Sequence, residues 1–422
     1  MTGERSLEWD IIISGAGAGG LTLASYLAGR GHRILVLDPR MGIGPIRRGE
    51  LIQPLGLGIL EELDLLEELW SLPHYRNESF RFLDGKGNLL MRSRYDSLGG
   101  RFPYAVSLEP HLLDGIMVDR LKADPGVVFK FGCRYRSHRS GAEGITVEWE
   151  DAQGIRTARS SVLVADDGRR SGVRENGRFP GKVMTYKDSY LSWSFDLPSD
   201  APPFLLEPEG RYFIGRGKIF FVFSVSPTRR YFLYMLKNGD RHVFDSRGTK
   251  GFLDEIEGWI PGLGNHLEAS GLTDVTAVPE MRVMKVSLGN WTDGRVVLLG
   301  DAAHAMNPHV AQGRNQAMED ARVLAPILSG FLNGGARNPD LLKGYERFRR
   351  PVTESLHRLA DEMTLVWNTS NPLVVPVRER VFRGIGRRSE LEKKIVRTIS
   401  GTSFQPLTAW DKFKALWYGA VH

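Results

Sequence analysis

The fold of this chain is decided by the stretch DIIISGAGAGGLTLASYLAGRGHRILVLD at residues 10–38. Residues 10–14 form a short apolar run bounded by glycine, which is typical of a buried parallel strand. Residues 21–28 carry the small and aliphatic side chains of a helix that packs on a sheet. Residues 33–38 are a second apolar run and end in a carboxylate, so the stretch predicts a βαβ unit.

The glycine spacing inside this unit is that of a dinucleotide-binding loop. Gly15, Gly17 and Gly20 lie between the strand and the helix, and Asp38 ends the second strand. The first glycine allows the tight turn, the second lets the backbone approach a pyrophosphate, and the third lets helix and strand pack closely. The N–H groups at the helix start, at Ala18 and beyond, bind phosphates. Asp38 accepts hydrogen bonds from ribose hydroxyls and disfavours a 2′-phosphate, which favours FAD or NAD over NADP.

Composition excludes several classes of protein. The chain has 422 residues, of which 41% are hydrophobic and 25% charged, enough to bury the cores of two or three domains. The single cysteine, Cys133, excludes an intramolecular disulfide and a cysteine zinc site. We therefore expect a reduced, cytoplasmic protein without a metal site, in which Cys133 is an inert buried thiol.

We expect no transmembrane segment and no nucleic-acid partner, while contact of the basic C-terminal region with an acidic partner or a membrane surface stays an alternative. No run reaches 18 uninterrupted apolar residues, so no transmembrane segment is expected, and residues 1–9 lack the apolar core of a signal peptide. The net charge of +6 arises from residues 343–422, which hold 15 Lys/Arg and 8 Asp/Glu. Because acidic residues are interleaved there and no nucleic-acid motif is present, we interpret this region as a solvated helical surface.

A second ligand-binding segment occupies residues 294–320, GRVVLLGDAAHAMNPHVAQGRNQAMED. Its apolar strand places Gly300 and Asp301 at the carboxyl end, where α/β folds bind ligands. A carboxylate there can hold the ribityl hydroxyls of a flavin, and a helix beginning near Gly313 would stabilise negative charge on the ring. The residues expected to surround the ring are Pro308, Ala311, Gln312, Gly313 and Asn315.

The remaining sequence suggests a nucleotide domain with an insertion. Aromatic residues crowd residues 181–240 in strand-like runs, which predicts an antiparallel sheet. Leu60, Leu63, Leu66 and Leu69 repeat at helical spacing and predict one core helix over residues 59–70. The predicted fold is α/β, with a Rossmann-like FAD-binding domain, an inserted antiparallel β-sheet substrate domain and a C-terminal helical segment. The predicted parts are 1–180 and 275–345 for the FAD-binding domain, 181–274 for the substrate domain and 346–422 for the helical segment, with 76–100 a candidate addition to the substrate sheet.

With a third motif, Asp167-Gly168 followed by Val173-Arg174, the sequence resembles the class A flavoprotein aromatic hydroxylases, which have the p-hydroxybenzoate hydroxylase fold. The three motifs occur in the order that family shows and span residues 10–320. The chain is most similar to members from alkylquinolone and indole-type secondary metabolism. The resemblance implies FAD as cofactor and adds Asp167, Arg47 and Arg48 to the residues expected beside it.

Three positions depart from the family pattern. Ala311 stands where the family usually has glycine, which predicts a stiffer loop beside the ring, and Asp166 adds an acid where alanine is usual. Residues 107–112 lack the arginine that many members carry near the cofactor and the nicotinamide path. Electrons could therefore come from NADH or NADPH directly or through a partner flavin reductase, and these alternatives stay open.

The resemblance implies a monooxygenase that hydroxylates a small, electron-rich aromatic or an indole- or quinoline-like molecule. Oxygen from the co-substrate O2 would be transferred through a flavin C4a-hydroperoxide. His309 is the candidate catalytic side chain, with an exposed loop histidine as the alternative, and His304 is expected to shape its loop. The candidate substrate contacts, from the aromatic sheet, are Phe221, Phe223, Tyr234 and Trp193.

Two other functions remain open for a chain with these motifs. A flavoprotein resembling the geranylgeranyl reductases would saturate double bonds without oxygen. A flavin-binding module without catalysis would sense redox state or support a complex. Oxygen consumption coupled to product separates the first from a monooxygenase, and a closed ring face would favour the second.

Overall fold

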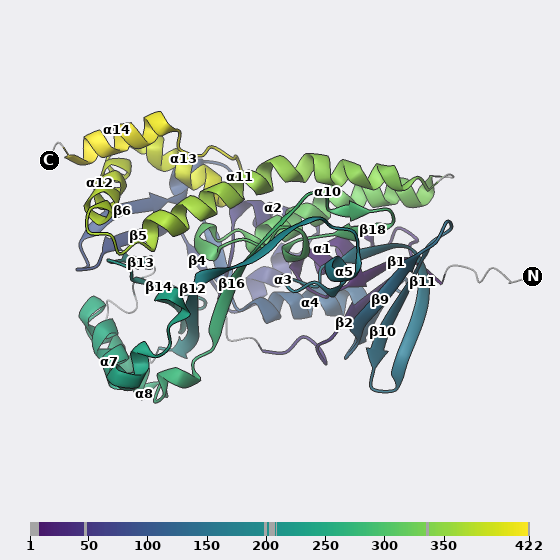
Figure 1. Cartoon of the computed structure of the whole chain (residues 1–422), viewed down its shortest axis with the longest axis horizontal. Coiled ribbons are helices and arrows are strands. Elements are labelled where there is room, and N and C mark those ends of the chain that lie inside the picture. The colour runs from purple at the N-terminus through teal and green to yellow at the C-terminus, as the bar shows by residue number, and fades with distance from the viewer. Residues whose placement is uncertain are drawn as a thin grey trace, which may run out of the picture.

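The computed structural model describes residues 8–45, 49–197, 201, 207, 209–334 and 337–420 (Figure 1). Two large sheets lie at opposite ends of the molecule, and long helices run along one side between them. The predicted α/β class with a Rossmann-like unit, a β-rich insertion and C-terminal helices is confirmed.

The first sheet has eight strands and contains the predicted βαβ unit. Strand β1 pairs in parallel with β2 and with β11, and the parallel core continues to β8 and β18. All five side chains of β2 are buried, as expected for a strand covered on both faces. The parallel strands and the first helix are β1 (Trp9–Ser14), α1 (Ala18–Leu27), β2 (Ile34–Asp38), β8 (Val127–Phe131), β11 (Gly154–Ala165) and β18 (Val296–Leu298). The antiparallel strands are β9 (Arg134–Ser140), β10 (Ile145–Asp151) and β17 (Thr292–Asp293).

The second sheet has seven strands in the order β16-β12-β15-β14-β13-β5-β6. All of its neighbours pair antiparallel except β13 and β5, which are parallel. Strands β5 and β6 come from residues 76–100, and β16 lies beyond residue 274, where the predicted insertion ends. The strands are β5 (Ser79–Asp84), β6 (Leu89–Arg94), β12 (Gly181–Asp196), β13 (Gly210–Ile214), β14 (Ile219–Ser224), β15 (Arg229–Leu236) and β16 (Glu280–Leu288).

Alternation along β14 sends its side chains into two different cores. Phe221 and Phe223 belong to the core that faces the C-terminal helices. Phe220 and Val222 belong to the core on the other face, which is covered by α7 (Val243–Trp259) and α8 (Leu263–Ala269). One face of the sheet thus packs toward the C-terminal helices and the nucleotide domain, and the other face packs against α7 and α8.

Four helices close the chain: α11 (Lys343–Trp367), α12 (Val374–Gly386), α13 (Ser389–Ser400) and α14 (Ala409–Ala420). Helices α12 and α14 approach closely at Gly384 and Gly419. A Cβ at Gly384 would lie 1.7 Å from the carbonyl oxygen of Ala415, so a larger residue there would separate the helices. In the described part of the chain, no helix combines the length and apolarity needed to cross a bilayer.

A third sheet is separate from the two large ones and has three short strands. Strands β3 (Glu50–Ile52), β7 (Ala105–Leu108) and β4 (His74–Asn77) form it, in that order.

The prediction of a single helix over residues 59–70 is wrong. The chain forms α2 (Pro54–Glu62) and α3 (Leu66–Ser71), because Asp64 has a φ of 53° that no helix can include.

Helices α4 (Pro110–Lys122) and α10 (Gly313–Asn333) pack against α1. Helix α10 begins at Gly313, as predicted, and α9 (Asp301–His304) is the short turn that follows β18. Cys133 is buried, as predicted.

Candidate functional site

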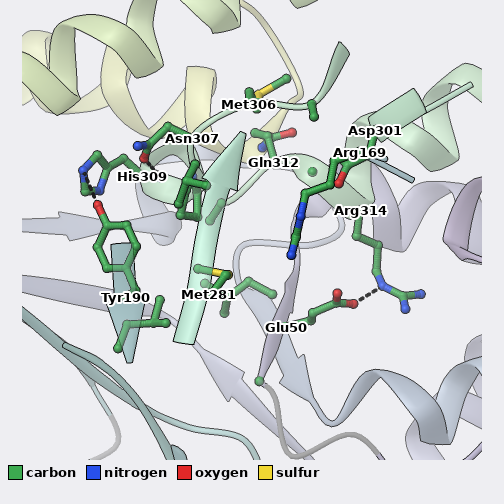
Figure 2. Close-up of a pocket in the computed structure, with 18 of the residues that line it drawn as sticks. Glu50, Arg169, Tyr190, Met281, Asp301, Met306, Asn307, His309, Gln312 and Arg314 are labelled. Carbon is green, nitrogen blue, oxygen red and sulfur yellow. Dashed lines mark hydrogen bonds and ion pairs between the residues drawn. The ribbon is translucent and has the colours of Figure 1, made fainter. Parts of the chain in front are cut away.

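The site lies in a cavity of about 380 Å³ between the nucleotide domain and the seven-stranded sheet (Figure 2). Its walls combine the first glycine loop, the segment that follows β18 and the inner face of the aromatic sheet. These elements are distant in sequence, so the fold brings the separate motifs to one place. Of the predicted residues, it is lined by Gly17, Ala18, Asp301, Pro308, His309, Ala311, Gln312, Gly313, Phe221 and Phe223.

The glycine loop leaves no room for side chains. Gly15 has a φ of 108°, which an L-residue rarely adopts. A Cβ at Gly20 would lie 2.4 Å from the carbonyl oxygen of Gly15, so this glycine allows the close helix–strand packing that the motif predicts. Helix α1 begins at Ala18, and its first N–H groups therefore meet the cavity with the positive end of the helix dipole.

The acid that departs from the family pattern lies against this loop. Oδ2 of Asp166 accepts a 2.8 Å hydrogen bond from the N–H of Gly20. A Cβ at Gly17 would lie 2.5 Å from the same oxygen, so the side chain closes the space behind the turn. Burial raises the pKa of Asp166 well above its ordinary value, and the negative charges of Asp301 and Asp167 act in the same direction.

Asp38 shares its carboxylate with an arginine that the sequence did not indicate. Its oxygens accept hydrogen bonds of 2.8 Å from the N–H of Ala16 and from two nitrogens of Arg40. Arg40 also donates to the carbonyl of Ala16 and lines the cavity, whereas Asp38 is 4% exposed and does not. A ribose hydroxyl at Asp38 would therefore lie beside a neutralised pair, which weakens the charge argument against a 2′-phosphate.

The segment after β18 is anchored from behind by a buried acid. Asp320, on α10, accepts hydrogen bonds from the N–H of Gly300 at 3.0 Å, from Nε2 of His304 at 2.5 Å and from Nε of Arg349 at 2.7 Å. Burial opposes its charge, but His304 and Arg349 hold the pKa of Asp320 at about 2. His304 thus shapes the loop that carries Asp301, and Gly300 lies behind the cavity wall.

Asp301 and Asp167 differ in their position relative to the main cavity. Asp301 opens α9 and lines the main cavity together with Arg169 (Figure 2). Asp167 does not line that cavity: its Oδ2 accepts a 3.1 Å hydrogen bond from the N–H of Val173, and it borders an adjoining hollow with Asp301. Of these two acids, Asp301 is the one placed to meet a ligand in the main cavity.

An ion-pair network lies on the cavity wall and includes a residue of α4, the helix that begins within residues 107–112. Arg314, at the start of α10, is paired with Glu50 and, at 2.8 Å, with Asp114 on α4. The guanidinium is 7% exposed, and all three residues line the cavity. Both arginines on the cavity wall near α4, Arg314 and Arg40, are thus paired with carboxylates of the protein.

Asn315 and Gln312 hold the loop in place through their side chains. Asn315 is fully buried; its Oδ1 accepts from the N–H of Gln53 at 2.8 Å and its Nδ2 donates to the carbonyl of Leu51 at 3.0 Å. It does not line the cavity, so it positions strand β3 against the loop. Gln312 lines the cavity while its Nε2 donates to the carbonyl of Ile399 on α13.

Ala311 adopts the left-handed conformation, with φ 49° and ψ 39°. Only glycine adopts this region without steric cost, which explains why the family usually has glycine here. The predicted stiffness of this loop therefore has a structural source in the Cβ of Ala311.

His309 is buried, so the alternative of an exposed loop histidine is wrong. Its Nε2 lies 3.0 Å from Oδ1 of Asn368 and 3.1 Å from the hydroxyl of Tyr190. Because Nδ2 of Asn368 donates to Asp188, its Oδ1 faces the histidine as an acceptor, and this pairing assigns the ring proton to Nε2. Burial lowers the pKa of His309 to about 4, so the ring is neutral at pH 7.

Two of the predicted substrate contacts are not at the cavity. Tyr234 and Trp193 lie on the opposite face of the sheet, in the core under α7 and α8. Phe221 and Phe223 do line the cavity, and they are joined there by aromatic residues not chosen from the sequence: Tyr190, Tyr212 and Tyr231. Arg47 and Arg48 lie outside the described residues.

The cavity fits an extended dinucleotide with an aromatic ring at one end. A helix N-terminus and a side-chain-free loop can hold a pyrophosphate. The cavity wall also includes Arg40, Asp301 and the 308–313 segment, and Asp38 lies behind Arg40. The described residues contain no cluster of metal ligands. Fold and site together define a flavin-dinucleotide-binding protein. Residues 8–360 match the family described as FAD binding domain, and the chain belongs to this family.

Known relatives agree with this assignment. The chain is 26% identical over 353 residues to 6-methylpretetramide 4-monooxygenase of Streptomyces rimosus, which covers 83% of this chain and 82% of that protein. It is 24% identical over 420 residues to the ubiquinone hydroxylase UbiL of Rhodospirillum rubrum, covering 95% and 92%. The chain is an FAD-dependent monooxygenase.

Solved structures show the same fold. The p-nitrophenol 4-monooxygenase PnpA of Pseudomonas putida matches with a TM-score of 0.80 at 20% identity, covering 93% of this chain and 97% of that one. PqsL of P. aeruginosa, in complex with 2-aminobenzoylacetate, matches with a TM-score of 0.75 at 21% identity, covering 87% and 98%. The resemblance to the class A aromatic hydroxylases is confirmed.

Proposed function

We propose that this protein hydroxylates a small, electron-rich aromatic substrate, of the phenol, indole or quinoline kind, bound against the aromatic wall of the cavity. One observation carries the proposal: the flavin-binding segment 308–313 and the phenyl rings of Phe221 and Phe223 line the same cavity. Bound FAD supplies the oxygen-transfer chemistry, with O2 as co-substrate. The protein must hold the aromatic ring beside the flavin and keep water out.

Several residues can hold the flavin by the chemistry of their groups. The N-terminus of α10, at Gly313, favours negative charge on the edge of the ring that it faces. The N–H groups of Gly17 and Ala18 suit a pyrophosphate, and the carboxylate of Asp301 suits the hydroxyls of the ribityl chain. Asn315 supports this arrangement from behind, because its hydrogen bonds tie the start of α10 to strand β3.

We assign His309 the role of orienting a polar group of the substrate. Its pKa of about 4 makes it a poor general base near pH 7, because too little driving force remains for proton abstraction. As the Nε2–H tautomer it keeps Nδ1 as a hydrogen-bond acceptor, next to the aromatic side chains of Tyr190 and Tyr212 on the same wall. A hydroxyl or ring N–H of the substrate would be directed by that atom.

The electron donor is either NADH or NADPH binding directly, or a partner reductase that supplies reduced flavin. Arg314 and Arg40 are each paired with carboxylates of the protein, so their charges favour neither donor. Anaerobic mixing of the FAD-loaded protein with NADH and NADPH tests this directly. Bleaching of the flavin within seconds supports direct reduction; bleaching only when a flavin reductase is added supports the partner.

The whole proposal is tested by comparing the O2 consumed with the amount of oxygenated product formed. The FAD-loaded protein is incubated with reductant and a panel of phenols, indoles and hydroxyquinolines, while O2 uptake and products are measured. Uptake matched by a product one oxygen atom heavier supports hydroxylation. A product that gains two hydrogens without O2 uptake would instead support the double-bond reductase alternative.

A further inference from the structure

A second, larger cavity of about 560 Å³ lies between the inner face of the seven-stranded sheet and the C-terminal helices. The elements around it appear together in Figure 1, where α11, α12 and α13 lie over β5, β6 and β13. Its wall is mainly apolar and includes Phe82, Met363, Val366, Val381, Phe382 and Ile395. Protein interiors pack at the density of organic crystals, so a space of this size is far larger than a packing defect. It falls in the range of ~300–1,000 Å³ typical of small-molecule sites.

Two large polar side chains of this wall, Tyr95 and Arg378, make hydrogen bonds to the protein. The hydroxyl of Tyr95 donates to Oε1 of Gln53 at 2.7 Å. The two terminal nitrogens of Arg378 donate to the carbonyls of Trp367 and Ile214 at 3.0 and 2.9 Å. The inner chamber therefore presents hydrocarbon surface and suits an aliphatic ligand.

Charged side chains lie on the wall of the chamber where it approaches solvent. Glu362 of α11 and Lys412 of α14 form an ion pair of 2.5 Å and are each more than two-fifths exposed. Exposed ion pairs of this kind contribute little stability, so this edge can open at small cost.

The chamber and the flavin cavity share four lining residues: Leu51, Tyr212, His309 and Ala311. Tyr212 stacks on Phe221 with ring centroids 3.6 Å apart, and Ala311 belongs to the flavin-binding segment. The chamber therefore begins beside the place where the substrate ring would lie. A chain attached to that ring could pass between these side chains.

We propose that the chamber binds an aliphatic tail, so that the substrate is an aromatic ring bearing a long alkyl or prenyl chain. The proposal rests on the proposed function for the position of the ring, but the chamber itself stands on its volume and its apolar wall. Each methylene group buried in it should tighten binding by about fourfold, the equivalent of ~0.8 kcal/mol.

The test uses 4-alkylphenols from 4-methylphenol to 4-heptylphenol, titrated calorimetrically into the FAD-loaded protein without reductant. The dissociation constant is expected to fall by about fourfold per methylene until the chamber is full. A dissociation constant that does not change with chain length would overturn the proposal.

Two variants fill the chamber from different helices, and a third serves as matched control. Val366→Trp on α11 and Val381→Trp on α12 place an indole in the space. Leu365→Trp makes the same kind of change one residue away on α11, where the side chain is 76% exposed. The filling variants should weaken 4-heptylphenol at least tenfold and change 4-methylphenol less than twofold, while the control binds both like wild type. Unchanged 4-heptylphenol binding in both filled variants would refute the chamber.

Binding without turnover keeps this proposal separate from the proposed function. A protein that binds longer phenols more tightly but never consumes O2 with any of them retains the chamber and loses the hydroxylase proposal. A protein that hydroxylates 4-methylphenol but shows no gain with chain length retains the proposed function and loses the chamber.

Discussion

The N–H of Gly20 and the carboxyl group of Asp166 lie 2.8 Å apart, so a buried acid occupies the first turn of the helix that should hold a pyrophosphate. A helix N-terminus favours negative charge, and here the protein supplies one of its own beside the site for the ligand's phosphates. Burial reduces the repulsion between Asp166 and the phosphates, because it raises the pKa of Asp166 and so favours the neutral carboxyl group.

Asp166→Asn should remove a pH dependence from FAD binding. Because the pKa of Asp166 is raised in the folded protein, its carboxyl group stays neutral above the pH range in which a free aspartate ionises. The free energy of unfolding and the affinity for the anionic dinucleotide should both fall as the pH rises through this raised pKa. Asparagine keeps an acceptor for Gly20 and cannot ionise. In flavin fluorescence titrations at a series of pH values, the affinity of wild type should fall as the pH rises, while the affinity of the variant should change much less. Parallel pH profiles would contradict this role.

Asp320→Asn should destabilise the protein and release the loop that carries Asp301. The change leaves His304 and Arg349 buried without their anion, which costs about 3–5 kcal/mol. Chemical denaturation measures the loss, and Glu354→Gln, at an exposed ion pair, is the matched control with no measurable loss. In wild type, the pKa of about 2 means that this stabilisation is present above pH 4 and is lost as pH falls through 2.

Two buried histidines should make the protein less stable in mild acid. Burial lowers the pKa values of His309 and His357 to about 4. The unfolded chain takes up protons near pH 6.5 and the folded chain does not, so the free energy of unfolding falls from pH 6.5 to 4. Each histidine should contribute about 3 kcal/mol to this fall. Denaturation curves of His309→Gln and His357→Gln should be flatter in this range; a slope equal to wild type would refute the assignment.

The conformation of Ala311 predicts opposite results for two substitutions. Glycine accepts φ 49° without strain, so Ala311→Gly should bind FAD like wild type and lose no stability. A β-branched residue is a genuine outlier there, and Ala311→Val should lower the midpoint of thermal unfolding and weaken FAD by about tenfold or more. Equal behaviour of the two variants would mean that the loop relaxes to another conformation.

Local patterns in the sequence were sufficient for much of the fold. The glycine spacing from Gly15 to Gly20 predicted the turn, and the start of α10 at Gly313 followed from the change of residue pattern after the loop. Alternation placed Phe221 and Phe223 on one face of their strand, as the structure shows. These features depend on neighbours in sequence, where periodicity is informative.

The rest depended on pairing between distant segments. Tyr234 faces the same core as Phe220 because the two residues are directly paired across β14 and β15, and this register is not written in either strand alone. Arg314 reaches Glu50 across 264 positions of sequence and Asp114 across 200. The turn at Asp64, with its positive φ, likewise interrupted a leucine repeat that continued through it.

The central claim, that the cavity binds FAD through the glycine loop, is tested most directly by titrating the apo-protein with FAD and following flavin fluorescence. Wild type should bind one FAD per chain. Gly17→Val should bind none, because a Cβ there would lie 2.5 Å from Asp166. The matched control is Gly258→Ala on α7, an exposed helical position with nothing within 4 Å of an added Cβ, which should keep its FAD. A wild type that takes up no FAD, or a Gly17→Val variant that binds it as tightly, would contradict the account.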